Sequence, residues 1–226
     1  MAVPPHYDLV NRVLTWGQDE RWRRQAAREC LRGNPQRLLD IGCGTGDLAV
    51  RLAGRQGQSV IALDYSLPML ELARRKAEAA TVSDRVHLVH GDVANLPFPD
   101  DYFDCVGIAF AFRNLTYKNP YARRYLQEVY RVLRPGGGRF VIVESSQPHH
   151  RLVRLFFRLY LRWFVYPVGR LISGNRTAYR YLAESAARFY TPSELAGILA
   201  GVGFSRFTSR PYLFGAAAVQ VAVKGD

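Results

Sequence analysis

The sequence predicts an α/β fold with one mostly parallel, seven-stranded sheet that ends in an antiparallel hairpin. Three observations lead to this fold class. Short apolar runs alternate with stretches of helical periodicity, and a glycine-rich loop follows the first run. The last two apolar runs are joined by a loop too short for a parallel crossover. A chain of 226 residues is long enough for one sizeable domain and short for two.

Five apolar runs are expected to form parallel strands, at residues 37–41, 59–63, 86–90, 104–110 and 139–144. Helices are expected before and between these strands, at residues 7–32, 47–54, 67–80 and 120–133. Strands that alternate with helices of this length form right-handed crossovers, which build a parallel sheet. The three glycines at 136–138 end the last of these helices and lead into the fifth strand.

The C-terminal part changes character. Thr191 and Glu194 have capping-box spacing, which predicts a helix over residues 192–201. The runs at 204–209 and 217–223 then form the hairpin. We expect a single domain over residues 1–226, with N-terminal helices over the site at 1–35 and a helical, substrate-side insertion at 150–190.

Composition narrows the classes of protein. The three cysteines form no evenly spaced framework, so reduced thiols are expected, and the absence of CxxC or HExxH pairs predicts no metal. No signal peptide or run of 18 uncharged apolar residues is found, which predicts a cytoplasmic protein or one peripheral on the inner face of the membrane. The net charge of +12 suits an anionic partner, either nucleic acid or a lipid surface.

The glycine-rich loop is the strongest functional signal. Asp40 lies in the first predicted strand, and three glycines follow it at alternate positions, namely Gly42, Gly44 and Gly46. Glycine allows close approach of a ligand to the backbone, and ligands of open α/β sheets bind beyond the carboxyl ends of the strands. A dinucleotide loop has its third glycine one residue later, where this chain has Asp47. A carboxylate there suits the amino-acid end of S-adenosylmethionine and repels a diphosphate, although a glycine-rich turn without a ligand is the alternative.

Acidic residues after the next two strands complete the predicted cofactor site. Asp64 ends the second strand 18 positions after Gly46, close to the spacing of roughly 20 at which an acid meets ribose hydroxyls. Tyr65 follows it and is assigned to the same site. Asp92 and the backbone amide of Val93 are expected at the adenine edge, with a simple turn-forming role as the alternative for Asp92.

Several motifs together resemble known methyltransferases. The glycine loop and the segments 62–64, 91–92, 96–98 and 132–137 resemble class I methyltransferases, which have a Rossmann-like fold. Three further segments resemble, more narrowly, the C-methyltransferases of ubiquinone and menaquinone biosynthesis. These segments are 7–8 with Asn11, 112–114 and 179–185, and the resemblance runs from about Tyr7 to Val223.

That resemblance implies methylation of a ring carbon on a prenylated benzoquinol or naphthoquinol, with the menaquinone branch favoured. It implies cofactor contacts from Tyr7, Thr45, Asp64, Asp92 and Val93. Relatives often have serine at the position of Ala109, so a side-chain hydrogen bond from that part of the cofactor site is not expected here.

The same resemblance assigns acceptor activation to Asp47, Arg113 and Asn114. A hydroquinone becomes a carbon nucleophile when its hydroxyl loses a proton. Arg113 stays charged, so it is expected to stabilise the developing phenolate and to orient a water molecule that takes the proton. Asn114 is expected to fix the second oxygen or the same water, and Asp47 to be the final base. The alternative is that Arg113 only pairs with a carboxylate at the sheet edge.

The positive charge is concentrated in residues 151–165. On a helix, Arg151, Arg154, Arg158 and Arg162 fall within a stripe of about 80°, and the residues around them are aliphatic or aromatic. This pattern predicts peripheral membrane contact through 151–165. The alternative is a lid helix with a solvated arginine edge, and one helix is able to serve both purposes.

Three other functions were weighed. A methyltransferase for another phenolic or polyketide acceptor would share the cofactor loop and is the main alternative. An RNA methyltransferase is disfavoured because the basic residues interleave with apolar ones and no Asn/Asp-Pro-Pro-aromatic motif is present, so no nucleic-acid partner is expected. A regulatory protein without catalysis is disfavoured because Arg113 and Asn114 are present. The ring type, the prenyl length and the question of a homodimer stay open.

Overall fold

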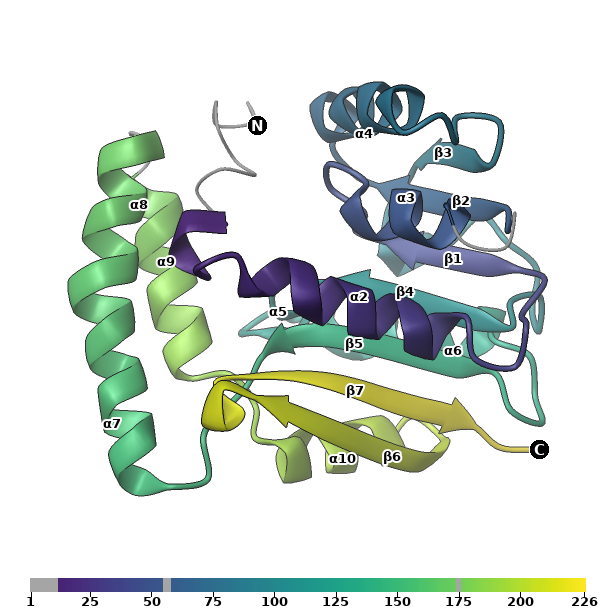
Figure 1. Ribbon diagram of the computed structural model, residues 1–226. Coiled ribbons are helices and arrows are strands. Elements are labelled where there is room, and N and C mark those ends of the chain that lie inside the picture. Colours follow the sequence, from purple (N-terminus) through teal and green to yellow (C-terminus); the bar gives the residue numbers. More distant parts are fainter. Residues whose placement is uncertain (1–11, 55–57, 174–175) are drawn as a thin grey trace.

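The computed structural model describes residues 12–54, 58–173 and 176–226, and a seven-stranded sheet forms its centre (Figure 1). The strand order is β3-β2-β1-β4-β5-β7-β6. The first five strands along the chain are parallel, and β7 pairs antiparallel with both β5 and β6. The strands are β1 (Leu38–Ile41), β2 (Val60–Asp64), β3 (Val86–His90), β4 (Cys105–Ala109), β5 (Arg139–Ser145), β6 (Phe204–Tyr212) and β7 (Ala217–Lys224). The predicted sheet and its terminal hairpin are therefore confirmed.

Helices cover both faces of the sheet, so β1 is buried along its whole length, and β4 and β5 are buried except at terminal residues. One face packs against α2 (Gln18–Cys30), α3 (Asp47–Ala53) and α4 (Leu67–Ala79). The other face packs against α5 (Phe112–Thr116), α6 (Ala122–Val132) and α10 (Pro192–Ala200). The predicted capping box is present, because the Thr191 hydroxyl accepts from the Glu194 backbone N–H and the Glu194 carboxylate accepts from the Thr191 N–H.

The first predicted helix is wrong as one continuous element. Residues 12–14 are helical, residues 15–17 form a turn, and α2 begins at Gln18. Trp16 and Gly17 both have left-handed backbones, with φ of 54° and 69°. Glycine adopts this conformation without steric cost, so Gly17 permits the break that the apolar periodicity conceals. The rest of the prediction, including Tyr7 and Asn11, lies outside the described residues.

A set of helices follows β5, and we call it the helical cover. It consists of α7 (Arg151–Tyr160), the π-helical turn η2 (Leu161–Val165), α8 (Tyr166–Ser173) and α9 (Arg176–Ala187). Figure 1 shows α7 and α8 as one long rod beside α9. These helices lie beyond the carboxyl end of β5. The cover has its own small core, in which Leu161, Val165 and Tyr179 pack against Leu14 from the N-terminal segment. Among the described residues, no helix is both long enough and apolar enough to cross a membrane.

Candidate functional site

The glycine loop joins β1 to α3 at the carboxyl end of the sheet. Gly42, Gly44 and Gly46 all have left-handed backbones, with φ between 54° and 80°. A Cβ atom on Gly42 would lie 2.9 Å from the Ala111 Cβ, and one on Gly46 would lie 2.9 Å from the Ala73 Cβ. A Cβ on Gly44 would meet no atom within 4 Å. Two glycines therefore let the loop pack closely, while Gly44 borders open space.

Asp64 holds this loop from the end of β2. One carboxylate oxygen accepts a 2.8 Å hydrogen bond from the Gly44 N–H, and the other accepts one of 2.8 Å from the Ser66 N–H. A carboxylate has about four lone-pair sites, so two acceptor positions are left for a ligand. The neighbouring Tyr65 side chain is 75% exposed, and its carbonyl lies 3.0 Å from a ring nitrogen of His90.

Asp92 and Val93 lie after β3, at the start of the short helix η1 (Val93–Asn95). The Asp92 carboxylate accepts a 2.9 Å hydrogen bond from the Ala94 N–H, and Val93 is buried. Asp92 therefore caps a turn, which is the alternative role given for it above. The second oxygen of its carboxylate takes no part in that cap. Ala109 is the last residue of β4 and is half-buried.

Asp40 is a buried carboxylate in the middle of the sheet. It is 1% exposed, and neither carboxylate oxygen has a hydrogen-bond partner among the described residues. Burial raises the pKa of Asp40 well above its usual range, and the nearby Asp64 and Asp47 carboxylates add to the rise. The Ala49 amide and Arg23 offset part of it.

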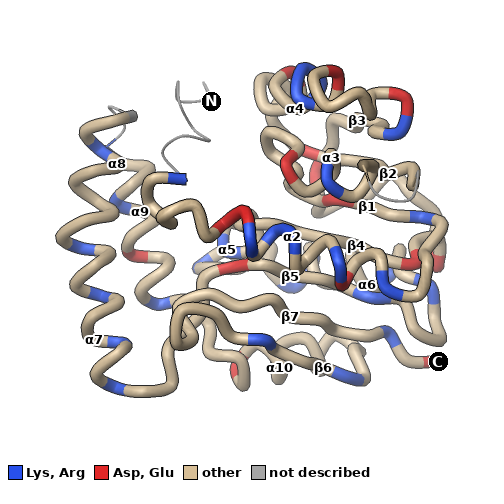
Figure 2. The backbone as a smooth tube through the Cα atoms, in the orientation of Figure 1, with Lys and Arg blue, Asp and Glu red and all other residues tan. Residues whose placement is uncertain are grey.

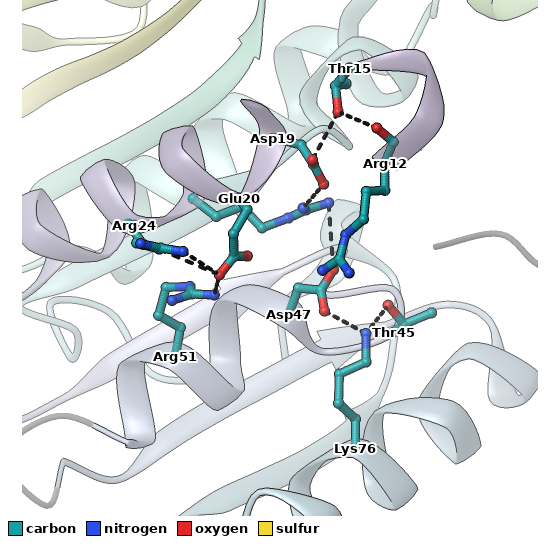
Figure 3. A network of polar contacts seen from close by, with 10 residues as sticks. Arg12, Thr15, Asp19, Glu20, Arg24, Thr45, Asp47, Arg51 and Lys76 are labelled. Atoms are coloured by element: carbon teal, nitrogen blue, oxygen red, sulfur yellow. Dashed lines mark hydrogen bonds and ion pairs between the residues drawn. The ribbon is translucent and has the colours of Figure 1, made fainter. Parts of the chain in front are cut away.

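A network of charged side chains surrounds Asp47 at the start of α3 (Figure 3). The Lys76 ammonium donates to Asp47 and, at 2.9 Å, to the Thr45 hydroxyl. Arg23 lies 3.5 Å from the other Asp47 oxygen and donates to Asp19 at 2.5 Å. Apart from Thr45, these residues line a cleft of about 590 Å³. Its full lining is Arg12, Asp19, Glu20, Arg23, Asp47, Val50, Arg51 and Lys76. The sequence reasoning identified Asp47 and missed its cationic partners, since nothing in the α4 sequence marks Lys76.

Arg113 is at the start of α5, just after β4, and it forms a buried ion pair. Its guanidinium donates to Glu144 at 2.6 Å and to the Ser145 hydroxyl at 2.8 Å, and its backbone N–H donates to Glu144 at 3.1 Å. Arg113 is 5% exposed and Glu144 is fully buried. The pairing with a carboxylate that was weighed as the alternative is therefore present. Glu144 was missed, although an acid at the end of an apolar strand was the available signal.

Asn114 differs from its neighbour because its side chain is exposed. Its backbone carbonyl accepts a 3.2 Å hydrogen bond from the Asn119 side chain. Of the three residues predicted for acceptor activation, Arg113 and Asn114 lie together on α5. Asp47 lies on α3, within the charged cleft.

The late tyrosine motif brings the helical cover to Arg113. The ring of Tyr181 on α9 lies 6.3 Å from that of Tyr117. Burial raises the pKa of Tyr181, and the nearby charge of Arg113 opposes part of this rise. Tyr179, in the same motif, packs inside the cover instead. The segments 112–114 and 179–185, which are far apart in the sequence, therefore meet at the carboxyl ends of β4 and β5.

This strand order, with a glycine loop after β1 and an acid at the end of β2, defines the class I fold of S-adenosylmethionine-dependent methyltransferases. Solved structures share the fold. A putative methyltransferase from Bacillus halodurans matches with a TM-score of 0.63 and 19% identity, over 90% of this chain and 99% of that one.

The chain belongs to the ubiE/COQ5 methyltransferase family, whose sequence model matches residues 1–224. A demethylmenaquinone methyltransferase from Thermus thermophilus is 44% identical over 220 residues, which cover 97% of this chain and 96% of that relative. A ubiquinone/menaquinone biosynthesis C-methyltransferase from Geotalea daltonii is 35% identical, with 99% and 93% covered. These matches confirm the family predicted from the motifs.

Proposed function

We propose that this chain transfers a methyl group from S-adenosylmethionine to a ring carbon of a prenylated quinol, in menaquinone or ubiquinone biosynthesis. The names of the relatives support this substrate class. The observation that carries the proposal is the meeting of Arg113, Glu144 and Tyr181 at the carboxyl ends of β4 and β5. The motifs that distinguish this family thus form one polar cluster beside the cofactor loop.

The loops after β1, β2 and β3, which we call the cofactor edge, fit S-adenosylmethionine. Asp64 keeps free acceptor positions for ribose hydroxyls, and the open space at Gly44 admits a ligand close to the backbone. The Asp40 carboxylate, which has no hydrogen-bond partner among the residues described, suits a cationic ligand at this site. We assign further contacts to Gly42, Thr45, Gly46, Tyr65, Asp92, Val93 and Ala109, and leave Tyr7 as a proposal from the sequence. When bound, the cofactor would supply a methyl group on a sulfonium, which a sufficiently activated ring carbon in line with the carbon–sulfur bond accepts as S-adenosylhomocysteine leaves.

Arg113 is the proposed activator of the acceptor. Glu144 fixes the guanidinium, and the Arg113 Nε has no hydrogen-bond partner among the described residues. A fixed positive charge stabilises the phenolate that develops as the quinol loses its proton. Asn114, which is exposed beside it, would hold the second ring oxygen or a water. Asp47 stays the proposed final proton acceptor, reached through the charged cleft.

The proposed reaction is tested with labelled S-adenosylmethionine and two acceptors, a demethylated naphthoquinol and a demethylated benzoquinol. We expect label on a ring carbon, with the higher kcat/KM for the naphthoquinol. Label on oxygen, or transfer only to unrelated phenols or polyketides, would contradict the proposed substrate class. The product is identified by mass spectrometry of the ring fragment.

We also propose that the helical cover contacts an anionic bilayer on the inner face of the membrane. None of the α7 residues is fully buried, and Leu152, Phe156 and Trp163 are 60%, 67% and 71% exposed. This apolar stripe runs beside the stripe of arginines on the same helix. Such an element suits the headgroup boundary of a bilayer.

The π-helical turn η2 extends both stripes into α8. One extra residue in a helix turns everything after it by about 100°, the angle that one residue occupies. After this rotation, Arg170 falls in line with Arg151, and Leu171 falls in line with Leu152. Both residues are exposed. The buried Leu161 and Val165 face the core of the cover, so a lid and a membrane contact are compatible in one helix. A homodimer through the apolar stripe is the competing use of this face.

A further inference from the structure

A second hollow lies next to the charged cleft, and we call it the aromatic hollow. It has a volume of about 490 Å³ and is lined by Arg12, Val13, Trp16, Gly17 and Phe164. Arg12 also lines the charged cleft, so the two spaces adjoin at this residue. On one side of Arg12 the lining is charged, and on the other side it is almost entirely apolar. The size is within the range usual for small-molecule pockets.

Two aromatic rings that line this hollow, Trp16 and Phe164, belong to a stack of three. Trp16 stacks on Phe164 with ring centroids 5.7 Å apart, and Phe164 stacks on Tyr160 at 5.2 Å. The Tyr160 hydroxyl donates a 2.5 Å hydrogen bond to the Leu14 carbonyl, which ties the N-terminal segment to the helical cover. The hollow therefore lies between two parts of the chain that fold over the same end of the sheet.

Trp16 lies in a turn and combines an exposed side chain with a left-handed backbone. The side chain is 73% exposed, and its φ of 54° is unusual for a bulky residue. Strained backbones of this kind are concentrated at ligand-binding and active sites. An exposed tryptophan in a strained turn, stacked over an apolar hollow, is suited to covering a flat hydrocarbon ligand.

We propose that the aromatic hollow binds the first isoprene units of the acceptor's tail, while the polar ring lies on the other side of Arg12. This inference rests on the proposed function. A quinol with an isoprenoid chain is polar at one end and hydrocarbon at the other, as are the two adjoining spaces. The unsaturated isoprene units pack against the exposed face of Trp16 and the edge of Phe164. The rest of the chain then leaves toward the exposed apolar stripe of α7.

The test measures KM, without vesicles, for naphthoquinols that carry no, one or two isoprene units. For the wild type we expect KM to fall on the order of tenfold from the tail-free to the prenylated acceptor, because apolar surface is buried. Trp16→Ala removes one of the two aromatic rings that line the hollow, and Val13→Trp fills the hollow. In both variants, the KM for the tail-free acceptor divided by the KM for a prenylated acceptor should approach one.

Phe214→Ala is the matched control. Phe214 is 87% exposed and also has a φ of 54°, but it lies in the hairpin between β6 and β7, outside the aromatic hollow. Its KM ratio should equal that of the wild type. Thermal melting of each variant, compared with the wild type, confirms that the fold is kept.

The outcomes separate the inference from the proposed function. If the wild type methylates no quinol, the proposed function fails. If it methylates all of them with equal KM, or if Phe214→Ala lowers the ratio as much as Trp16→Ala does, only the tail site is overturned. A change of oligomeric state in Trp16→Ala with an unchanged KM ratio would assign the hollow to contact between two copies of the chain, and would overturn the inference as well.

Discussion

The cofactor edge, formed by the loops after β1, β2 and β3, differs from the helical cover in the hydrogen bonds and ion pairs that its charged side chains form. At the cofactor edge, acidic side chains accept backbone hydrogen bonds, as Asp64 does from Gly44, and charges are paired, as Asp47 is with Lys76. In the cover, residues 151–173 include five arginines and no acidic residue. Figure 2 shows this contrast as blue bands along α7 and α8 and mixed red and blue around α3 and α4.

This difference locates the unbalanced charge of the protein. Arginines on α4, such as Arg74, are paired with Glu71 and Glu78 on the same helix. The five arginines of residues 151–173 have no acidic residue on their own helices, so they supply five of the net +12 charges. A net charge is therefore informative about partners only after the paired charges have been set aside. The paired charges of the cofactor edge and the unpaired arginines of residues 151–173 are the basis for the two different partners proposed for these regions.

The largest expected effect is at Arg113, where the two regions meet. Arg113→Ala should lower kcat by about 10²–10³, as loss of a transition-state donor does. It should also lower the free energy of unfolding by about 3–5 kcal/mol, because it leaves the buried Glu144 carboxylate unpaired. Steady-state kinetics and urea unfolding measure the two effects.

Two variants separate catalysis from stability here. Asn114→Ala changes an exposed residue, so it should lower kcat and alter stability by no more than about 0.5 kcal/mol. Adding Glu144→Gln to Arg113→Ala removes the unpaired charge and should restore much of the stability without restoring kcat. Recovery of turnover in that double variant would show that Arg113 acts only through the ion pair.

The next effect tests the cover. Replacing Arg151, Arg154, Arg158 and Arg162 with glutamine should remove about 1 kcal/mol of binding to anionic liposomes per residue. The wild type should co-sediment with such liposomes, less so as salt rises, because salt screens the charges. Methylation of a short-chain, soluble quinol should be little affected by the four replacements.

The control removes the same charge elsewhere. Four exposed arginines on other elements are changed to glutamine, namely Arg74, Arg75, Arg123 and Arg206. Equal loss of liposome binding in both quadruple variants would mean that net charge alone drives the contact. If the α7 variant binds liposomes as well as the wild type does, its arginines form only a solvated edge. If it loses methylation of the soluble acceptor, the helix is a packed lid.

The cofactor edge was also the more predictable region. Its strands have continuous apolar runs, and each glycine of the loop is needed for a left-handed backbone, so sequence and structure agree there. The break at Trp16 and Gly17 was not predicted, because the apolar pattern continues across it. Only Gly17 marked the place, and one glycine inside a helical pattern is a weak signal.

Long-range partners explain the other omissions. The partner of Arg113 is 31 residues away in β5, and the cations around Asp47 come from α2 and α4, so no local spacing encodes them. In the cover, periodicity predicts an amphipathic helix but does not say which apolar residues find neighbours. Leu161 is buried there, while Phe156 is 67% exposed.

A smaller effect is expected at Asp64. Asp64→Ala should weaken binding of S-adenosylmethionine and S-adenosylhomocysteine by roughly 1.5–3 kcal/mol, the contribution of hydrogen bonds to a charged group. The variant also loses the hydrogen bonds from Gly44 and Ser66, so the loop should become less ordered. Calorimetry measures both cofactors, with NAD as a ligand that should not bind. Asp84→Ala, an exposed acid before β3, is the control, and an unaffected Asp64→Ala variant would exclude Asp64 from the site.

The smallest effect concerns the stability of the cofactor edge itself. Asp40→Asn should raise the free energy of unfolding of the cofactor-free protein by about 1 kcal/mol at neutral pH. It removes a buried carboxylate that has no hydrogen-bond partner in the part of the chain that the structure describes. The same change should weaken binding of the cofactor. A residue that lowers stability and improves binding is expected in a site built for a cationic ligand.

The pH dependence gives this prediction its sign. The pKa of Asp40 is raised in the folded state, mainly by burial, so the folded protein binds more protons than the unfolded chain once pH exceeds about 4, the usual value for aspartate. The contribution of Asp40 to stability therefore becomes less favourable as pH rises from about 4 toward its folded pKa. Asparagine does not titrate, so the advantage of Asp40→Asn should be near zero at pH 4 and grow toward pH 7. Urea unfolding at both pH values, with and without S-adenosylhomocysteine, measures this difference. An advantage that shrinks as pH rises would mean that Asp40 is stabilised in its charged form by the protein alone, and that its carboxylate does not await a ligand.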